Sequence, residues 1–118
     1  MKKMFVDQMR LRLLEDKMRI LSKIEEFKKL HLQHHESGQD EAEMTSHDVN
    51  TNLAIELQER NRLALMRIER ALEKIEKNIY GVCESCGADI GSKRLMAQPL
   101  ARLCINCMKD LEERPQLH

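Results

Sequence analysis

The cysteines are the feature of the sequence that most limits how this chain can fold. All four lie in one stretch as two C-x₂-C pairs, Cys83/Cys86 and Cys104/Cys107, with 17 residues between the pairs. A gap of two residues lets both thiolates of a pair reach one ion from a tight turn. Gly87 follows the first pair, where such a turn favours a positive φ. Two pairs at this spacing predict one structural Zn²⁺ in a closed shell of four thiolates.

Other uses of the four thiols fit the sequence less well. Soft thiolates also suit iron–sulfur clusters. Disulfides need an oxidising compartment, but we see no signal peptide, and cytosolic thiols stay reduced. A thioredoxin-like pair needs a βαβ context, which the sequence does not show. Because the segment after residue 79 is too small to bury a sufficient apolar core, the metal would supply the missing stability, roughly 10–16 kcal/mol in zinc-finger peptides.

The composition upstream of the cysteines is that of long helices. Of the 118 residues, 34% are charged and 3% are aromatic, and Gly38 is the only glycine or proline before residue 80. No apolar run approaches the ~20 residues that a membrane helix needs. We therefore expect a soluble, cytoplasmic protein with a mainly α fold. It would consist of a long antiparallel coiled-coil hairpin, a small four-cysteine zinc-finger module and a short C-terminal helix.

Two helices are expected to form the hairpin, which we predict as one domain over residues 1–79. The first, over residues 1–34, has one apolar stripe with the 3-4-3 spacing of a coiled-coil seam, namely Leu11, Leu14, Met18 and Leu21. A second stripe lies on another side and consists of Leu13, Ile20, Ile24 and Phe27. The second helix, over residues 51–79, carries a heptad seam of Ala54, Leu57, Asn61, Ala64, Ile68, Ala71, Ile75 and Asn78. Tyr80-Gly81 would end this helix.

The rest of the chain, residues 80–118, is predicted to be a second domain made of the zinc module and the C-terminal helix. That helix would run from Ile105 to Glu113 and pack Ile105, Met108 and Leu111 against the base of the hairpin. Between the two long helices, residues 35–50 hold five acids and no Lys or Arg, and we predict an acidic turn or irregular tip there. The net charge of zero argues against a general nucleic-acid binder, which would show a basic excess.

The segment from Ala71 to Cys107 resembles the DksA/TraR C4-type zinc-finger family, and the resemblance extends over residues 56–113. The matching elements are Tyr80-Gly81-Val82-Cys83, Cys86-Gly87, Arg94-Leu95, Ala97, Pro99, Ala101 and Leu103-Cys104. The resemblance implies a bacterial transcription regulator that binds RNA polymerase directly and does not read DNA sequence. It also implies a coiled coil that enters the polymerase secondary channel, acidic tip residues that act near the catalytic centre, and a response together with ppGpp.

The family tip is typically Asp-x-x-Asp-x-Ala, and two stretches of this chain align with it in part. Asp48 begins one, with Thr51 where the second acid would fall. Asp40 begins the other, with Glu43 as the second acid and Thr45 in place of Ala. The candidate polymerase-facing acids are thus Asp40, Glu43 and Asp48.

Basic residues near the base of the hairpin are candidates for a contact with polymerase or a nucleotide. They are Arg67, Arg70, Lys93 and Arg94. The alternative is a solvated face on which they pair with Glu69, Glu73 and Glu76.

Two functions remain open from the sequence. The first is the polymerase-binding regulator. The second is a coiled-coil adaptor or scaffold whose zinc module mediates protein–protein contacts. An enzyme is not expected, because a closed four-thiolate site has no open coordination position and no acid–base pair is held on a rigid frame. We expect a monomer with no membrane partner and no sequence-specific DNA binding.

Overall fold

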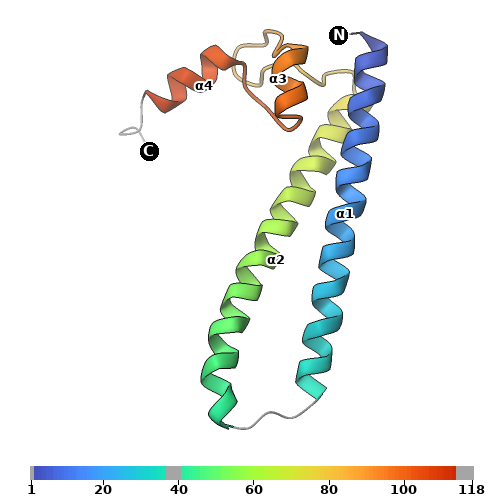
Figure 1. Ribbon diagram of the computed structural model, residues 1–118. Helices are drawn as coiled ribbons and strands as arrows, with labels where there is room; N and C mark the ends of the chain where they lie inside the picture. Colours follow the sequence, from blue (N-terminus) through green and yellow to red (C-terminus); the bar gives the residue numbers. More distant parts are fainter. Residues whose placement is uncertain (1, 37–40, 114–118) are drawn as a thin grey trace. The chain divides into compact units, whose positions relative to one another are not determined.

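The structure is a computed structural model that describes the backbone of residues 2–36 and 41–113, and the side chains of residues 2–30 and 51–113. These residues form four helices, α1 (Lys3–Glu36), α2 (Glu41–Glu76), α3 (Ser92–Ala97) and α4 (Ile105–Glu112) (Figure 1). The described backbone has a single isolated β-bridge and no longer strand. The prediction of a mainly α chain with two long helices is confirmed.

The chain falls into two compact units that cut across the long helices. The terminal unit comprises Met1–Leu14 and Glu69–His118, and the central unit comprises Glu15–Ile68. The start of α1 therefore groups with the end of α2 and with the cysteine segment. The predicted division into a hairpin domain, 1–79, and a zinc domain, 80–118, stays a prediction.

The terminal unit has a core that α1, α2 and the cysteine segment build together. In this unit the two helices run side by side in opposite directions (Figure 1). Arg10 of α1 pairs with Glu76 of α2 at 3.6 Å. Besides two of the cysteines, the buried hydrophobic side chains are Met9, Leu13, Ala71, Ile75, Tyr80, Ile90 and Leu95. Leu13 and Leu95 are completely buried, so α1 and α3 each insert one leucine into this core.

The central unit is an antiparallel pair of helical segments (Figure 1). Among its described side chains only Ile24, Gln58 and Ile68 are buried. Several large apolar side chains are instead more than 40% exposed, namely Met18, Leu30, Leu53, Ile55, Leu57, Leu63 and Met66. The antiparallel hairpin predicted from the two periodic stretches is confirmed in its direction, but its seam buries little apolar surface.

The stripe of α1 that becomes buried is not the one with coiled-coil spacing. Leu13 and Ile24, from the second stripe, are buried. Leu11 and Met18, from the first, are 63% and 64% exposed. The prediction that the first stripe forms the hairpin seam is therefore wrong for these positions. Two apolar stripes on one helix satisfy the same periodicity, and only the position of the partner helix decides which of them is covered.

The predicted seam of α2 follows the covered face of the helix from Ala54 to Ile75, except at Leu57. Ile68, Ala71 and Ile75 are buried as expected. Leu57 is 49% exposed, whereas its neighbour Gln58 is only 8% exposed. The real stripe thus passes through Gln58, one position from the predicted one. A polar side chain at a buried position hides the seam from a reading of hydrophobic residues alone.

Both ends of α2 differ from the prediction. The helix begins at Glu41, so residues 41–50, which were expected to be a turn, are helical. Glutamates in the first turn favour a helix start because they face the positive end of the helix dipole, and Ala and Met are good helix formers. Glu41 and Glu43 supply those charges.

The helix ends at Glu76 in a Schellman motif that does not use the expected glycine. Asn78 has a φ of 60°. The Ile79 N–H donates to the Lys74 carbonyl at 2.9 Å, and the Asn78 N–H donates to the Ile75 carbonyl at 3.1 Å. Asn tolerates this left-handed conformation better than most residues with a side chain. Asn78, assigned to the heptad seam from the sequence, is therefore the residue that stops the helix.

The C-terminal helix forms where it was expected, but its packing was predicted wrongly. α4 spans Ile105–Glu112 and has no buried residue. Ile105 and Leu111 are both 51% exposed, so they do not pack against the base of the hairpin as predicted. α3 was not predicted. In the described part of the chain, no helix combines the length and the apolar character needed to cross a membrane.

Candidate metal centre

The first cysteine pair lies on a tight hairpin turn. Val82 and Asp89 form the antiparallel bridge that closes it. Within the turn, the Cys83 N–H donates to the Ala88 carbonyl at 2.8 Å, and the Ala88 N–H lies 3.4 Å from the Cys86 Sγ. An N–H that points at a sulfur stabilises a thiolate there. The backbone of the turn therefore places one N–H beside the second sulfur of the pair.

Gly87 makes this turn possible through its backbone conformation. Its φ is 77°, a region that L side chains rarely adopt, and its N–H donates to the Cys83 carbonyl at 3.0 Å. A Cβ built on Gly87 would meet no atom within 4 Å. The glycine is thus required for its torsion angle and not for space, as the sequence position predicted.

The second cysteine pair starts a helix. Cys104 is the N-cap residue of α4, and Cys107 lies in the first turn of that helix. The Met108 N–H donates to the Cys104 carbonyl at 3.0 Å. Just before the pair, the Arg94 Nε of α3 donates to the Leu103 carbonyl at 3.0 Å. α3 therefore fixes the backbone that delivers the second pair of sulfurs.

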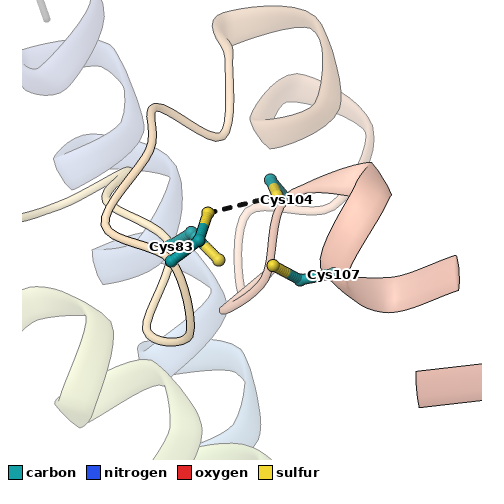
Figure 2. Close-up of side chains that lie close together, drawn as sticks. Cys83, Cys104 and Cys107 are labelled. Carbon is teal, nitrogen blue, oxygen red and sulfur yellow. Dashed lines mark hydrogen bonds between the residues drawn. The ribbon is translucent and has the colours of Figure 1, made fainter. Parts of the chain in front are cut away.

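The four sulfurs converge on one point. Their Sγ atoms all lie within 4.8 Å of one another, and Cys86 Sγ is 3.7 Å from Cys104 Sγ. Figure 2 shows the side chains of Cys83, Cys104 and Cys107 turned toward a common centre. The dashed line marks the contact between the sulfurs of Cys86 and Cys104. A regular tetrahedron with arms of about 2.3 Å has edges of about 3.8 Å, close to the observed separation. The four thiols fit one structural zinc ion.

The pKa values of two cysteines in the cluster are shifted in opposite directions. Hydrogen bonds from the backbone of Cys86 and Cys104 lower the pKa of Cys83 to about 6. In contrast, contacts with the side chains of Cys104, Cys86 and Cys83 raise the pKa of Cys107 to about 12. Protein groups alone thus favour one thiolate and oppose another beside it. A divalent ion supplies the missing positive charge and deprotonates the ligating thiols outright.

A charged group inside the first cysteine turn ties the centre to α2. Glu84 contacts the Lys74 Nζ through one carboxylate oxygen and the Arg102 Nε through the other, at 2.8 Å. These two cations lower the pKa of Glu84, with the Lys74 hydrogen bond as the largest cause. The Glu84 N–H also donates to the Arg102 carbonyl at 2.9 Å. One residue therefore joins α2, the first turn and the segment before the second pair.

Two further side chains brace the segment between the pairs. The Tyr80 hydroxyl donates to the Pro99 carbonyl at 2.8 Å, and the Arg12 Nη1 of α1 donates to the Met96 carbonyl at 2.6 Å. Burial raises the pKa of Tyr80 to about 12, so the hydroxyl stays protonated at neutral pH. Periodicity could not identify these braces, because each one joins a side chain to a backbone carbonyl far away in the sequence.

The other residues predicted to be functional differ in how much of them the structure describes. Arg94 is engaged with the Leu103 carbonyl, whereas Arg67, Arg70 and Lys93 are exposed. Glu43 and Asp48 lie on α2, at positions where the structure describes the backbone alone, and Asp40 lies outside the described residues. Among the predicted site residues whose side chains are described, the four cysteines are the ones that the structure brings together.

Comparison with known proteins places the chain in a family. The profile of the prokaryotic dksA/traR C4-type zinc finger matches residues 78–113. The solved structure of transcription factor DksA2 from Pseudomonas aeruginosa matches with a TM-score of 0.89 and 30% identity, over 98% of this chain and 88% of that one. The chain belongs to the DksA/TraR C4-type zinc-finger family. The resemblance seen in the sequence is therefore confirmed, and with it the structural zinc ion.

Other members of the DksA/TraR family share shorter or more distant likeness. The RNA polymerase-binding transcription factor DksA of Escherichia coli K12 is 38% identical over 68 residues, which are 58% of this chain and 45% of the relative. The factor of the same name from Haemophilus influenzae is 35% identical, over 58% of this chain and 47% of the relative. The match thus spans less than half the length of these curated relatives. A structure of an RNA polymerase binding protein from Chlamydia trachomatis L2, 24% identical with a TM-score of 0.55, shares the fold.

Proposed function

We propose that this protein is a bacterial transcription regulator that binds RNA polymerase and inserts its coiled-coil tip into the secondary channel. The observation that carries the proposal is the likeness to the transcription factor DksA2 over nearly the whole chain, long helices as well as cysteine segment. The curated relatives, named RNA polymerase-binding transcription factors, support the same partner. In this proposal the protein acts in the cytoplasm as a monomer, by binding and not by catalysis.

The working end in this proposal is the acidic stretch between α1 and the middle of α2. It holds Asp40, Glu43 and Asp48 and no Lys or Arg between residues 35 and 50. Carboxylates presented there would face the catalytic Mg²⁺ of the polymerase or basic elements beside it, through charge complementarity. The two candidate alignments of the tip differ in which of these acids contributes most.

Basic residues near the cysteine segment are the second part of the proposal. Arg67, Arg70 and Lys93 are exposed, and they would contact polymerase or the phosphates of ppGpp. Arg94 is better explained as a structural residue, because its Nε already holds the Leu103 carbonyl. No sequence-specific DNA contact is part of the proposed mechanism.

The test is competition for bacterial RNA polymerase against a known secondary-channel factor. The wild-type protein should displace that factor from the polymerase, with a competition curve that fits a single dissociation constant. The triple variant Asp40→Asn, Glu43→Gln, Asp48→Asn should keep its zinc and lose its effect on transcription. Glu56→Gln, an exposed acid further along α2, is the matched control and should behave as wild type. Full activity of the triple variant would contradict the role proposed for the tip. Failure of the wild-type protein to compete would contradict binding in the secondary channel.

One observation favours an adaptor as the alternative function. α4 is amphipathic but buries none of its residues, and Ile105 and Leu111 lie half-exposed on it. An apolar helix face that no described residue buries can dock in a groove of a partner protein. The adaptor would be preferred if the protein failed to bind polymerase and instead formed a stable homodimer in analytical ultracentrifugation.

A further inference from the structure

The terminal unit contains a cavity that neither the zinc centre nor the tip uses. Its volume is about 310 Å³, and it is lined by Val6, Ile75, Asn78, Tyr80, Val82, Gly87 and Asp89. This is the lower end of the size range of ligand pockets, roughly 300–1,000 Å³. All of these residues belong to the terminal unit, so the cavity lies where the start of α1, the end of α2 and the first cysteine turn meet.

The wall of the cavity combines apolar and polar groups. Val6, Ile75 and Val82 supply aliphatic surface, and Val82 remains 41% exposed. Tyr80 also lines the cavity, and its hydroxyl donates to the Pro99 carbonyl. An occupant of this cavity would therefore carry an aliphatic stem that packs on these groups.

The described lining residues carry a single negative charge, and the Arg12 guanidinium lies close enough to Tyr80 to oppose the rise of its pKa. Asp89 is the one charged side chain among the described residues that line it, and it is exposed. Tyr80 adds no charge at neutral pH, since burial raises its pKa to about 12. Asn78 lies two positions beyond Glu76, the last residue of α2, where the helix dipole places its negative end. An occupant should therefore carry a positive group at the end of its apolar stem.

We propose that this cavity receives the side chain of an arginine from the RNA polymerase, which deepens the function proposed above and rests on it. Arginine combines a long aliphatic stem with a planar guanidinium. That group can pair with both oxygens of a carboxylate and stack on an aromatic ring, whereas a lysine ammonium offers a point charge only. In this cavity, the carboxylate of Asp89 and the ring of Tyr80 are the two groups that would favour an arginine over a lysine.

The first experiment tests the cavity without the polymerase. Methyl-labelled, zinc-loaded protein is titrated with N-acetyl-arginine N-methylamide and followed by NMR. We expect saturable shifts at the methyl groups of Val6, Ile75 and Val82, and none with the uncharged citrulline analogue. Absence of shifts in the millimolar range would overturn the proposal, and equal shifts with the lysine analogue would overturn the choice of arginine.

The second experiment tests the partner with two substitutions of one residue. Asp89→Asn should weaken binding to purified RNA polymerase roughly two- to fivefold, the range of an exposed ion pair. Asp89→Arg should weaken it by at least about tenfold, because like charges then meet. Asp110→Asn, which removes an exposed carboxylate on α4, is the control and should leave the affinity unchanged.

The two experiments separate the failure of this inference from the failure of the proposed function. If the wild-type protein does not bind polymerase, the proposed function fails, and this inference fails with it whatever the NMR shows. If the wild type binds and Asp89→Arg binds equally well, the polymerase does not use the cavity, and the proposed function stands. The NMR signals of Leu13 and Leu95 report in each variant whether the core is intact.

Discussion

The terminal and central units are held together in different ways, although the same two helices run through both. In the terminal unit, named side chains fix individual backbone groups: Arg12 holds Met96, Tyr80 holds Pro99 and Arg94 holds Leu103. In the central unit, the described part of the seam has Ile24 and Ile68 as its buried apolar residues and includes a buried glutamine. In the terminal unit, directional contacts and a metal specify one structure. In the central unit, a sparse seam mostly specifies the antiparallel direction of the two helical segments and their approximate register.

The difference predicts that metal removal acts on the units unequally, and this is the largest effect we expect. Cys83→Ser or chelation should unfold the cysteine segment, because zinc binding supplies roughly 10–16 kcal/mol in comparable peptides. Much of the helical circular dichroism should remain, since most of α1 and α2 lies in the central unit. Zinc content by mass spectrometry and NMR of the Leu95 methyl groups measure the two effects. Loss of all helical signal together with zinc would show that the units do not differ in this way.

Burial and not periodicity should decide the cost of a truncation in the central unit. Ile68→Ala removes a side chain that is 3% exposed, so it should lower the free energy of unfolding by about 2–5 kcal/mol. Leu57→Ala removes one that is 49% exposed, so it should cost less than about 1 kcal/mol. Urea denaturation of the two variants measures the difference. Equal losses of unfolding free energy would support the heptad seam predicted from the sequence, which includes both Leu57 and Ile68.

Tyr80 should give the terminal unit a sensitivity to alkaline pH. Its pKa is raised from 10.0 to about 12, mainly by burial, so its contribution to stability is complete below pH 10 and declines as the pH rises toward 12. Two pKa units correspond to about 2.7 kcal/mol at most. The Tyr80→Phe variant should not show this decline at alkaline pH. Because it lacks the hydrogen bond to Pro99, its free energy of unfolding at neutral pH should be about 1 kcal/mol lower. Thermal melts of both proteins between pH 8 and pH 11 provide the comparison, and parallel curves would contradict it.

Sequence reasoning was successful where one type of residue carries the signal at a fixed spacing. The four cysteines and Gly87 follow such a rule, and so does the start of α4 at Ile105. It failed where the outcome depends on a partner that is distant in the sequence. Leu11 and Leu13 belong to equally good stripes of α1, but only Leu13 meets other elements of the core. The braces from Arg12, Tyr80 and Glu84 leave no periodic trace.

The ends of α2 illustrate a second reason for failure. Asn78 fits the heptad spacing as well as it fits a helix stop, and the backbone resolves the conflict in favour of the stop. At the other end, residues 41–50 look like a loop by their polarity, but their glutamates favour a helix start. A polar stretch next to a glycine is compatible with both structures, and local propensity decides between them.

The smallest expected effect concerns Gln58, a buried polar side chain in the central unit. It is 8% exposed, and its Oε1 has no hydrogen-bond partner within the part of the chain that the structure describes. A buried acceptor without a partner costs about 1–3 kcal/mol, and an apolar side chain of similar shape does not incur that cost. Gln58→Met should therefore raise the free energy of unfolding by about 1 kcal/mol in urea denaturation.

A gain in stability at Gln58 would come with a loss of specificity if the glutamine sets the register of the two helical segments, as a buried polar residue does in coiled coils. Glu59→Met changes the neighbouring exposed position, whose pair with Arg62 at 3.5 Å contributes little, and it should leave stability within about 0.5 kcal/mol of wild type. A destabilised Gln58→Met would mean that the amide is satisfied through its nitrogen and contributes to the fold. The central unit would then, like the terminal one, depend on a directional contact.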